Sequence, residues 1–287
     1  MKVILLTSLL LCVTPLYVLA EPLHLIDKNE VLETVHTEQY ALNLIDEIFI
    51  DEKKMEFLID YLNPLVYSEP QNAMLDKYGT IVPEKPGFKL DRQNFIYSFQ
   101  RVFYNGKQNR ITIPKKIVFP KVDSELLAEI KTNEISHYST FFKKGNKERS
   151  TNIEIATKAI NNHVVFPGEK FSFNSVVGKR TEEKGYQRAP VIVKGELSED
   201  IGGGICQVSS TLYNAVDLPG IEMVERYSHS RSVPYVPPGR DATVSWYGPD
   251  FTFINKYSHP ILIRATSENG RMFIRIFSSE SVESKPN

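Results

Sequence analysis

The chain has 287 residues, and its 34 Lys and Arg side chains nearly balance its 35 Asp and Glu side chains, which gives a formal net charge of -1 at pH 7. This balance gives no support for general nucleic-acid binding, so we expect no nucleic-acid partner. A hydrophobic content of 41% is enough for packed cores, and two cysteines are too few for a disulfide framework. The fold is therefore expected to depend on packing.

The N-terminus is typical of a secretory signal peptide. A lysine at position 2 precedes an almost unbroken apolar run over residues 3–13, and Val18-Leu19-Ala20 resembles a small-x-small cleavage site. We expect residues 1–20 to be removed, which leaves about 267 residues of a secreted or cell-envelope protein. The alternative is an uncleaved anchor, which would be the contact with the membrane, but the run is short and Pro15 interrupts it.

Residues 21–137 are predicted to form an N-terminal module of helices followed by a small α+β part. Apolar side chains recur at three- and four-residue steps over residues 29–62, which predicts helices. Short strands are expected within residues 78–91 and 111–119, and Asp91 is placed to cap the helix that follows it. A short helix over residues 125–130 closes the module, and we expect the boundary between residues 137 and 149.

Charge is unevenly distributed along the chain. Residues 21–62 carry 11 acidic and 3 basic side chains, whereas residues 107–149 carry 10 basic and 5 acidic side chains. The basic stretch could contact anionic wall polymer or a membrane surface. The alternative is that both stretches are ordinary solvated surface.

Residues 138–287 are predicted to form a second α+β domain. Its expected elements are a helix over residues 151–161, strands near 171–173 and 191–193, a helix that bears a cysteine, a strand over 221–226, and antiparallel strands in the tail between 251 and 276. The fold class is therefore α+β throughout, with an antiparallel sheet at the C-terminus.

The most informative stretch covers residues 200–215 and contains Cys206, since Cys12 lies in the expected signal peptide. A lone cysteine in an exported protein has no disulfide partner in its own chain. Three glycines precede it, and the apolar residues at positions 208, 212 and 215 share one predicted helix face. A thiol at a helix N-terminus feels the positive end of the dipole and can be acidified, which favours a reactive cysteine over a packed structural one.

A nucleophilic thiol needs a base within hydrogen-bond reach and a group that orients that base. His229 follows the cysteine at the end of a predicted strand, and Asp241 follows after a proline-rich turn. The order is that of papain-like and transglutaminase-like cysteine enzymes, in which these residues act as nucleophile, general base and orienting group. The alternatives are structural: Cys206 would pack, His229 would hold a loop through a backbone carbonyl, and Asp241 would cap a turn.

Further residues near the thiol are expected to contact the substrate. The backbone amides at the start of the cysteine helix, or the side chain of Gln207, could hold an oxyanion. The expected substrate contacts are Gly202, Gly203, Gly204, Gln207, Ser209, Ser210 and Arg240. No Gly-Lys-Ser/Thr follows the glycines and no paired-ligand spacing is present, so neither a nucleotide, nor a metal, nor another cofactor is expected.

Segments of the C-terminal half together resemble the VanW family, over about residues 138–280. The resemblance is carried by Asn152-Ile153, Pro167–Asn174, Val177-Gly178, Arg180, Gly185-Tyr186, Gly202–Ala215, Tyr235–Val244, Asp250-Phe251 and Pro260–Ile263. Residues 62–130, with Gly87–Asp91, resemble more weakly the peptidoglycan-binding module that often precedes this domain.

The family is named after a vancomycin-resistance gene cluster of Gram-positive bacteria, so the resemblance implies a cell-envelope location. We therefore expect an exported protein that acts on peptidoglycan or its stem peptide, by cysteine-dependent acyl transfer or amide hydrolysis. Its expected partner is peptidoglycan or a wall peptide. The alternative is a non-catalytic peptidoglycan-binding or envelope-assembly protein.

Overall fold

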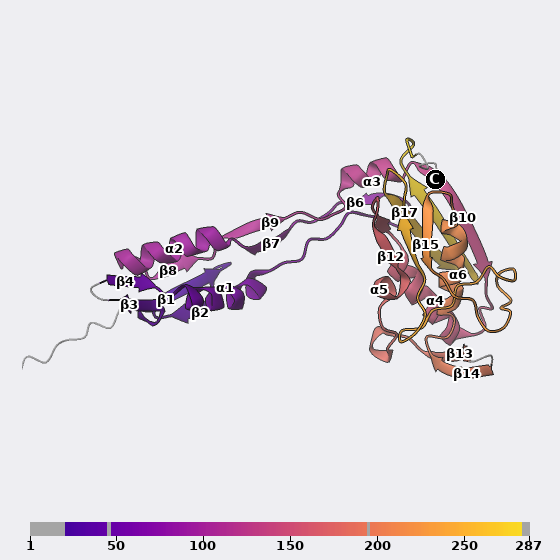
Figure 1. The fold of residues 1–287 in the computed structure, drawn as a ribbon, viewed down its shortest axis with the longest axis horizontal. Helices are drawn as coiled ribbons and strands as arrows, with labels where there is room; N and C mark the ends of the chain where they lie inside the picture. The colour runs from indigo at the N-terminus through magenta and orange to yellow at the C-terminus, as the bar shows by residue number, and fades with distance from the viewer. Residues whose placement is uncertain (1–20, 45–46, 194–195, 283–287) are drawn as a thin grey trace, which may run out of the picture. The chain divides into compact units, whose positions relative to one another are not determined.

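A computed structural model describes residues 21–44, 47–193 and 196–282, so the expected signal peptide, with Cys12, lies outside the described residues. The chain forms two compact units. The first comprises the residues up to 71 together with 85–120, and the second comprises 72–84 together with the residues from 121 onward. Both units mix helices and strands (Figure 1), which confirms the predicted α+β class. Within the described residues, every helix is too short or too polar to cross a membrane.

The first unit has one hydrophobic core, which two helices share with a three-stranded sheet. In this sheet β1 pairs with β2 in the antiparallel sense and with β8 in the parallel sense. The elements of the unit are β1 (Leu23–Asp27), β2 (Glu30–Val35), η1 (Thr37–Tyr40), β3 (Ala41–Leu44), β4 (Glu47–Ile50), α1 (Glu52–Val66), β7 (Gly87–Leu90), α2 (Arg92–Asn105), β8 (Arg110–Thr112) and β9 (Lys115–Val118). Asp91 accepts a hydrogen bond from the backbone N–H of Asn94, which confirms its predicted role as the cap of α2.

The helices predicted for residues 29–50 are wrong, because most of this stretch forms strands. Lys28 and Asn29 both have positive φ, of 47° and 68°, which is the geometry of a tight turn that matches the twist of a two-stranded hairpin. Strands β1 and β2 flank this turn and pair with each other. The spacing of the apolar residues in this stretch was compatible with both the helical period of about 3.6 residues and the strand period of 2. Ile45, which contributed to the helical pattern, lies outside the described residues.

The larger antiparallel sheets of the second unit have strand orders β10-β18-β17-β11 and β12-β16-β15, and β13-β14 and β5-β6 form two-stranded sheets. Its elements are β5 (Met74–Leu75), β6 (Ile81–Val82), α3 (Ser124–Ile130), β10 (Asn133–Phe141), α4 (Lys147–Ile160), β11 (His163–Val165), β12 (Lys170–Ser172), α5 (Phe173–Val177), η2 (Glu182–Lys184), β13 (Arg188–Val193), β14 (Glu196–Ile201), α6 (Ile205–Val216), β15 (Ile221–Glu225), β16 (Thr252–Asn255), β17 (Ile261–Glu268) and β18 (Arg271–Ser278). The predicted antiparallel strands of the tail are confirmed by β16, β17 and β18.

Helices α4 and α6 pack against the four-stranded sheet. Ile153 from α4, Leu212 from α6, and Ile263 and Ile274 from the sheet are all 0% exposed and belong to one core. Burial of each such side chain contributes about 1.5–3 kcal/mol relative to its exposure to water. The start of α6 is therefore held in a fixed place, which matters because the cysteine lies there.

The second unit begins before the boundary that the sequence suggested. Strand β10 starts at Asn133 and pairs with β18 along its length, so residue 137 falls inside a strand of this unit. Helix α3 also packs here, and its Leu127 and Ile130 share a smaller core with Leu75. The division into parts 21–137 and 138–287 stays a prediction.

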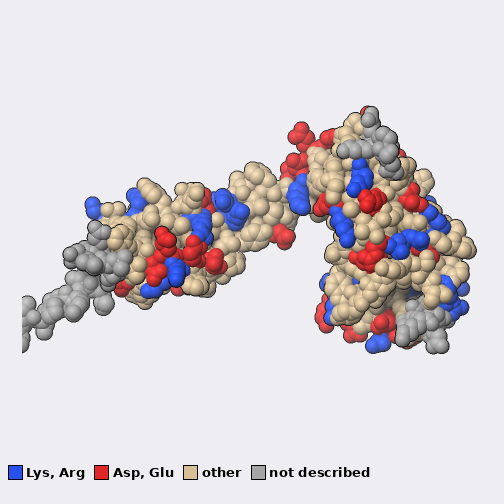
Figure 2. All heavy atoms as spheres, in the orientation of Figure 1, with Lys and Arg blue, Asp and Glu red and all other residues tan. Residues whose placement is uncertain are grey.

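The charged side chains do not form one surface of a single sign on the face drawn in Figure 2, where acidic and basic residues are interspersed over each unit. The basic stretch 107–149 is divided between the units at residue 120. Its contact with anionic wall polymer stays a prediction.

Candidate functional site

Cys206 lies in the first turn of α6, directly after the glycine loop, which we define as residues 202–204. Gly204 is the N-cap, and Gly202 and Gly204 have φ of 90° and 109°, a left-handed region that L side chains rarely adopt. The predicted helix face of α6 is confirmed, because residues 208, 212 and 215 are all 0% exposed. The sulfur is thus placed at a rigid helix N-terminus, where the helix dipole favours negative charge.

The glycine loop also passes too close to its surroundings for a side chain. A Cβ on Gly203 would lie 2.5 Å from the carbonyl oxygen of Ala189. A Cβ on Gly204 would lie 2.9 Å from Cγ of Arg149. The backbone of this loop therefore takes its path only because the residues are glycines.

His229 and Asp241 form a hydrogen-bonded pair beside the thiol. Oδ2 of Asp241 accepts a bond of 2.6 Å from the backbone N–H of His229 and lies 2.6 Å from Nδ1 of the same ring. Both side chains are nearly buried, with 6% and 9% exposure. With Nδ1 engaged by the carboxylate, the ring also interacts electrostatically with Cys206, and both residues line the same cleft. The structure therefore brings together the three residues that the sequence proposed as a triad.

The electrostatics of this group favour an ionised thiol. Burial alone would raise the pKa of Cys206, but the hydrogen bond with His229 and the charge of that ring outweigh burial and hold the pKa below its ordinary value. Burial would lower the pKa of His229, but its contacts with Cys206 and Asp241 outweigh burial and raise this pKa. Burial would raise the pKa of Asp241, but the bonds from His229 lower it. The three shifts favour a thiolate, an imidazolium and a carboxylate.

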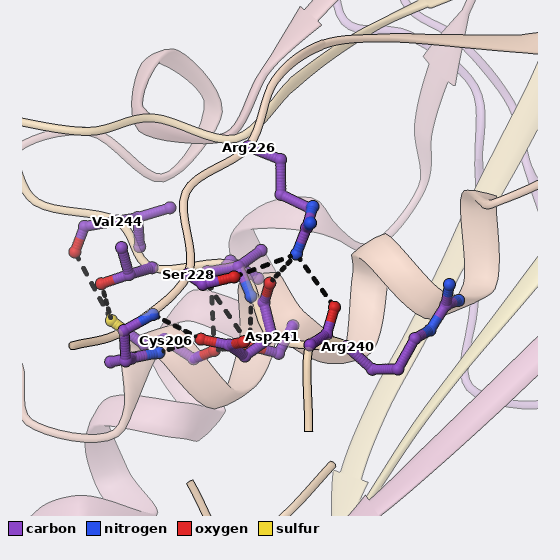
Figure 3. A network of polar contacts seen from close by, with 12 residues as sticks. Cys206, Arg226, Ser228, Arg240, Asp241 and Val244 are labelled. Carbon is purple, nitrogen blue, oxygen red and sulfur yellow. Dashed lines mark hydrogen bonds and ion pairs between the residues drawn. The ribbon is translucent and has the colours of Figure 1, made fainter. Parts of the chain in front are cut away.

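The segment that carries Asp241 is held against α6 by hydrogen bonds. Oγ of Ser209 donates to the carbonyl oxygen of Ala242 at 2.6 Å, and Oγ of Ser210 accepts from the backbone N–H of Ala242 at 2.9 Å. Nη1 of Arg226 donates to the carbonyl oxygen of Asp241 at 2.8 Å (Figure 3). Each such bond contributes about 0.5–1.5 kcal/mol, so the carboxylate is held at a fixed distance from the helix that bears the thiol.

The segment continues past the sulfur itself. The Cys206 sulfur lies 3.5 Å from the carbonyl oxygen of Val244 and 3.7 Å from Oγ1 of Thr243 (Figure 3). Both residues line the cleft into which the thiol opens.

Four of the expected substrate contacts lie away from this cleft. Ser209 and Ser210 are 0% exposed, and their hydroxyl groups are used within the fold. Arg240 forms an ion pair of 2.6 Å with Asp217 and lies over the ring of Tyr213. The backbone of Gly203 faces β13. These residues support the site from outside the cleft, and the substrate contacts predicted for them stay a prediction.

The cleft has a volume of about 800 Å³. Much of its wall is aromatic or apolar, and the residues of this kind include Phe141, Phe142, Ile201, Val233, Tyr235, Val244, Trp246 and Tyr247. Four cationic side chains line it, namely Lys143, Arg149, Lys179 and Arg180, against the single carboxylate of Asp200 among its described lining residues. Its size suits a peptide, and its charge suits an anionic group. Within the described part of the chain, no cluster of His, Cys, Asp and Glu could hold a metal ion.

Comparison with known proteins places the site in a family. The family model described as VanW like protein matches residues 148–277, which include the glycine loop, Cys206, His229 and Asp241. The "Uncharacterized protein YoaR" of Bacillus subtilis (strain 168) is 51% identical over 279 residues, which cover 95% of this chain and 92% of that protein. The "Vancomycin B-type resistance protein VanW" of Enterococcus faecalis (strain ATCC 700802 / V583) is 30% identical over 78 residues, which cover 27% of this chain and 28% of that protein.

The chain belongs to the VanW-like family. No solved structure matched it significantly. The matched region contains all of helix α6 and all of α4 except its first residue, so the match covers the elements that position the thiol.

Three cleft residues of this VanW-like protein were missed in the sequence. Arg149, Arg180 and Tyr235 all line the cleft, and the charge of Cys206 acts on each of them. Burial raises the pKa of Tyr235, and the charge of Cys206 raises it further, so the phenol keeps its proton. Arg180 and Tyr235 lie in segments that carry the family resemblance, but nothing in the local pattern marks either residue as facing a cleft.

The side chain of Gln207 is already occupied, which argues against its predicted role at an oxyanion. Its Nε2 donates to Oγ1 of Thr140 at 3.0 Å and to the carbonyl oxygen of Phe141 at 3.1 Å. Its Oε1 accepts from Nη2 of Arg149 at 2.9 Å. Gln207 thus holds Arg149 in place, and the backbone amides of α6 are the better candidates for contact with an oxyanion.

Proposed function

We propose that this VanW-like protein is an exported cell-envelope enzyme that forms a thioester at Cys206 with the peptide part of peptidoglycan. The acyl group then passes to an amine, which is transpeptidation, or to water, which is amide hydrolysis. The observation that carries the proposal is the convergence of Cys206, His229 and Asp241 at the wall of a peptide-sized cleft.

The chemistry would proceed in two balanced steps. The thiolate of Cys206 attacks the carbonyl carbon of a stem or cross-bridge peptide, and a C–S bond forms. The tetrahedral intermediate then expels the amine as the C–N bond breaks, and the imidazolium of His229 supplies the proton that this amine needs. In the second step, His229 takes a proton from the incoming amine or water, which attacks the thioester and releases the thiolate. Asp241 keeps Nδ1 of the ring engaged, so the other ring nitrogen faces the reacting atoms.

The developing oxyanion needs fixed donors. The backbone N–H of Cys206 lies in the first turn of α6, where helix N–H groups have no acceptor within the helix. Such a donor beside the nucleophile commonly contributes a factor of about 10²–10³ in rate. The left-handed glycine loop sets the direction of these amides, which gives the loop a role in the reaction as well as in the fold.

The envelope setting has separate support. The N-terminal residues have the pattern of a signal peptide. The Enterococcus faecalis relative is named as a vancomycin B-type resistance protein. The aromatic and apolar cleft wall is suited to a peptide rather than to a nucleotide. We propose peptidoglycan, or a peptide cut from it, as the partner.

The test is turnover of defined wall fragments. The mature chain is incubated with purified muropeptides, with and without an added amino acid as acyl acceptor, and the products are separated and weighed by mass spectrometry. Cleaved or exchanged stem peptides are expected, and Cys206→Ala should form none. Tight binding of the same fragments without any product, in a chain whose Cys206 remains alkylatable, would favour a non-catalytic wall-binding protein instead.

A further inference from the structure

Two arginines flank the glycine loop that precedes the thiol. Arg149 comes from α4, and its Cγ lies 2.9 Å from the position of a Cβ on Gly204. Arg180 follows α5, and its Cγ lies 3.2 Å from the position of a Cβ on Gly202. Both line the cleft, and both feel the charge of Cys206. The two cations are therefore placed on either side of the backbone that leads into the nucleophile.

Each guanidinium donates a hydrogen bond to a side-chain amide oxygen and not to a carboxylate. Nη2 of Arg149 donates to Oε1 of Gln207 at 2.9 Å, and Nη2 of Arg180 donates to Oδ1 of Asn174 at 2.7 Å. Nη1 of Arg180 is buried and has no partner among the described residues. A guanidinium carries five donors and stays charged at every ordinary pH. Partial burial of such a cation is costly unless an anion compensates it.

Arg149 is held in this orientation by a buried relay. Because Nε2 of Gln207 donates to Thr140 and to the carbonyl oxygen of Phe141, its Oε1 must face the arginine. Oγ1 of Thr140 lies 2.8 Å from Oγ1 of Thr211, whose own proton goes to the carbonyl oxygen of Gln207 at 2.6 Å. The relay fixes Arg149, a cation that forms no ion pair with any described residue, and this arrangement suits a ligand-binding residue.

We propose that Arg149 and Arg180 form a carboxylate-binding subsite that places a carboxylate of the acyl-donor peptide beside the carbonyl attacked by Cys206. The inference rests on the proposed function for the identity of the donor. The carboxylate has two possible sources, the C-terminus of the peptide and an acidic side chain within it. In either case the recognised group lies within one or two residues of the reacting bond, because both arginines lie over the loop next to the thiol.

A pair of small alkylating agents tests the subsite without any turnover. Iodoacetate and iodoacetamide both transfer a CH2 group to the Cys206 thiolate with loss of iodide, and they differ by a carboxylate against a neutral amide. We expect the ratio of the iodoacetate rate to the iodoacetamide rate, measured on the full mature chain, to exceed that of free cysteine about tenfold or more, since fixed charges within a few ångströms act strongly at a partly buried site. A ratio equal to that of free cysteine would overturn the proposal.

Matched variants assign the effect to the two arginines. Arg149→Gln and Arg180→Gln should each lower the ratio several-fold. Lys158→Gln makes the same change of charge on α4 at an exposed residue paired with Glu154, so its ratio should equal that of the wild type. The melting temperature and the iodoacetamide rate show whether each variant is folded. Where a glutamine variant is not folded, the corresponding lysine variant, Arg149→Lys or Arg180→Lys, is measured in its place. A ratio that falls equally in Lys158→Gln would mean long-range charge alone and would contradict a subsite.

Protection of the thiol by peptides separates the two sources. Three synthetic stem-like peptides are compared as inhibitors of alkylation by iodoacetamide: one with a free C-terminus and an internal acidic residue, one amidated at the C-terminus, and one with the acidic side chain as its amide. Loss of protection on amidation of the terminus assigns the terminal carboxylate, and loss with the side-chain amide assigns the side chain. Equal protection by all three peptides would overturn the proposal. Because protection needs no product, a failure of the subsite is distinguishable from a failure of the proposed enzyme activity.

Discussion

A single oxygen of Asp241 holds His229 at two points, with 2.6 Å to the backbone nitrogen and 2.6 Å to ring Nδ1. The backbone contact fixes where the residue lies, and the ring contact fixes how the imidazole is turned. The ring therefore cannot rotate away from Cys206 without the loss of a charge-assisted hydrogen bond, which is about twice as strong as a neutral one. This pair is the part of the site that most resembles catalytic machinery.

Asp241→Asn should lower the rate of thioester formation about 10²–10⁴-fold, because an amide can hold the ring in the wrong tautomer and does not stabilise an imidazolium. The measurement is single-turnover kinetics with a muropeptide. Asp217→Asn is the control, since Asp217 pairs with Arg240 on the surface and its loss should change the rate little. A rate for Asp241→Asn within a factor of two of the control would remove Asp241 from the mechanism.

The pH dependence of alkylation should report the thiolate–imidazolium pair. The pKa of Cys206 is lowered and that of His229 is raised, so the thiolate persists below the ordinary thiol pKa of about 8.5. As the pH falls, reactivity should be lost only when the lowered pKa of Cys206 is crossed. In His229→Gln the midpoint should move up toward the ordinary value. Iodoacetamide rates across the pH range would reveal the shift, and identical midpoints in the two proteins would contradict the pairing.

Substitutions in the glycine loop should disable the site for steric reasons. Gly204→Ala places a Cβ 2.9 Å from Cγ of Arg149 and 3.1 Å from Cγ1 of Ile153, at a φ of 109°. Gly239→Ala has a φ of 75° with open space around the Cβ, so it carries backbone strain of about 1–2 kcal/mol without a clash. We expect Gly204→Ala to lose turnover and to melt lower than Gly239→Ala, which should keep turnover. Equal effects would mean that strain alone, and not the close approach, explains the loop.

Removal of residues 1–137 should unfold the second unit. The cut deletes α3, whose Leu127 and Ile130 are 1% and 0% exposed, and it removes the start of β10 from its pairing with β18. Loss of a buried Leu or Ile side chain typically costs about 2–5 kcal/mol, so the loss of both approaches the stability of a whole domain. Thermal melting monitored by circular dichroism would show no cooperative transition. A sharp melt at the temperature of the full chain would show that this region is dispensable.

The sequence predicted the parts of the site whose signals are local. Glycines before a cysteine, apolar residues on one helix face, and a histidine and an aspartate further along were enough to name the triad, and the helix face of α6 is confirmed. Capping by Asp91 was also local and is confirmed. The helix face and the cap depend on residues within one or two turns of each other, where propensity and spacing decide the outcome, whereas His229 and Asp241 were named only from their order along the chain.

The rest depended on contacts between distant segments. Arg149 lies 57 positions before Cys206 and looks like any surface cation until α4 packs beside α6. Ser209 and Ser210 are polar and close to the thiol in sequence, yet they point into the fold because Ala242 lies there. Arg240 is held away from the cleft by its ion pair with Asp217. The strands at residues 30–50 were missed because the spacing of their apolar residues fits a helix as well as a strand. The tight turn at Lys28 and Asn29 favours the strands, because it joins β1 to β2 as a hairpin.

Cys206→Ala separates the chemistry of the thiol from its packing. Cys206 opens onto a cleft and is only partly buried, so its replacement by a small residue should change the free energy of unfolding by about 1 kcal/mol or less. Turnover of muropeptides should nevertheless be abolished. Chemical denaturation measures the first quantity and product analysis the second. A variant that turns over normally would reduce the cysteine to a packing residue.

Capture of the acyl-enzyme tests the central claim most directly. The full mature chain is mixed with a stem peptide, quenched in acid within the first turnover, and weighed intact, and the adduct is then located by peptide mapping. The account predicts a mass increase equal to the acyl part of the peptide, located on Cys206 and absent from Cys206→Ala. Product formation by Cys206→Ala at the wild-type rate, or an adduct located on any other residue, would contradict it.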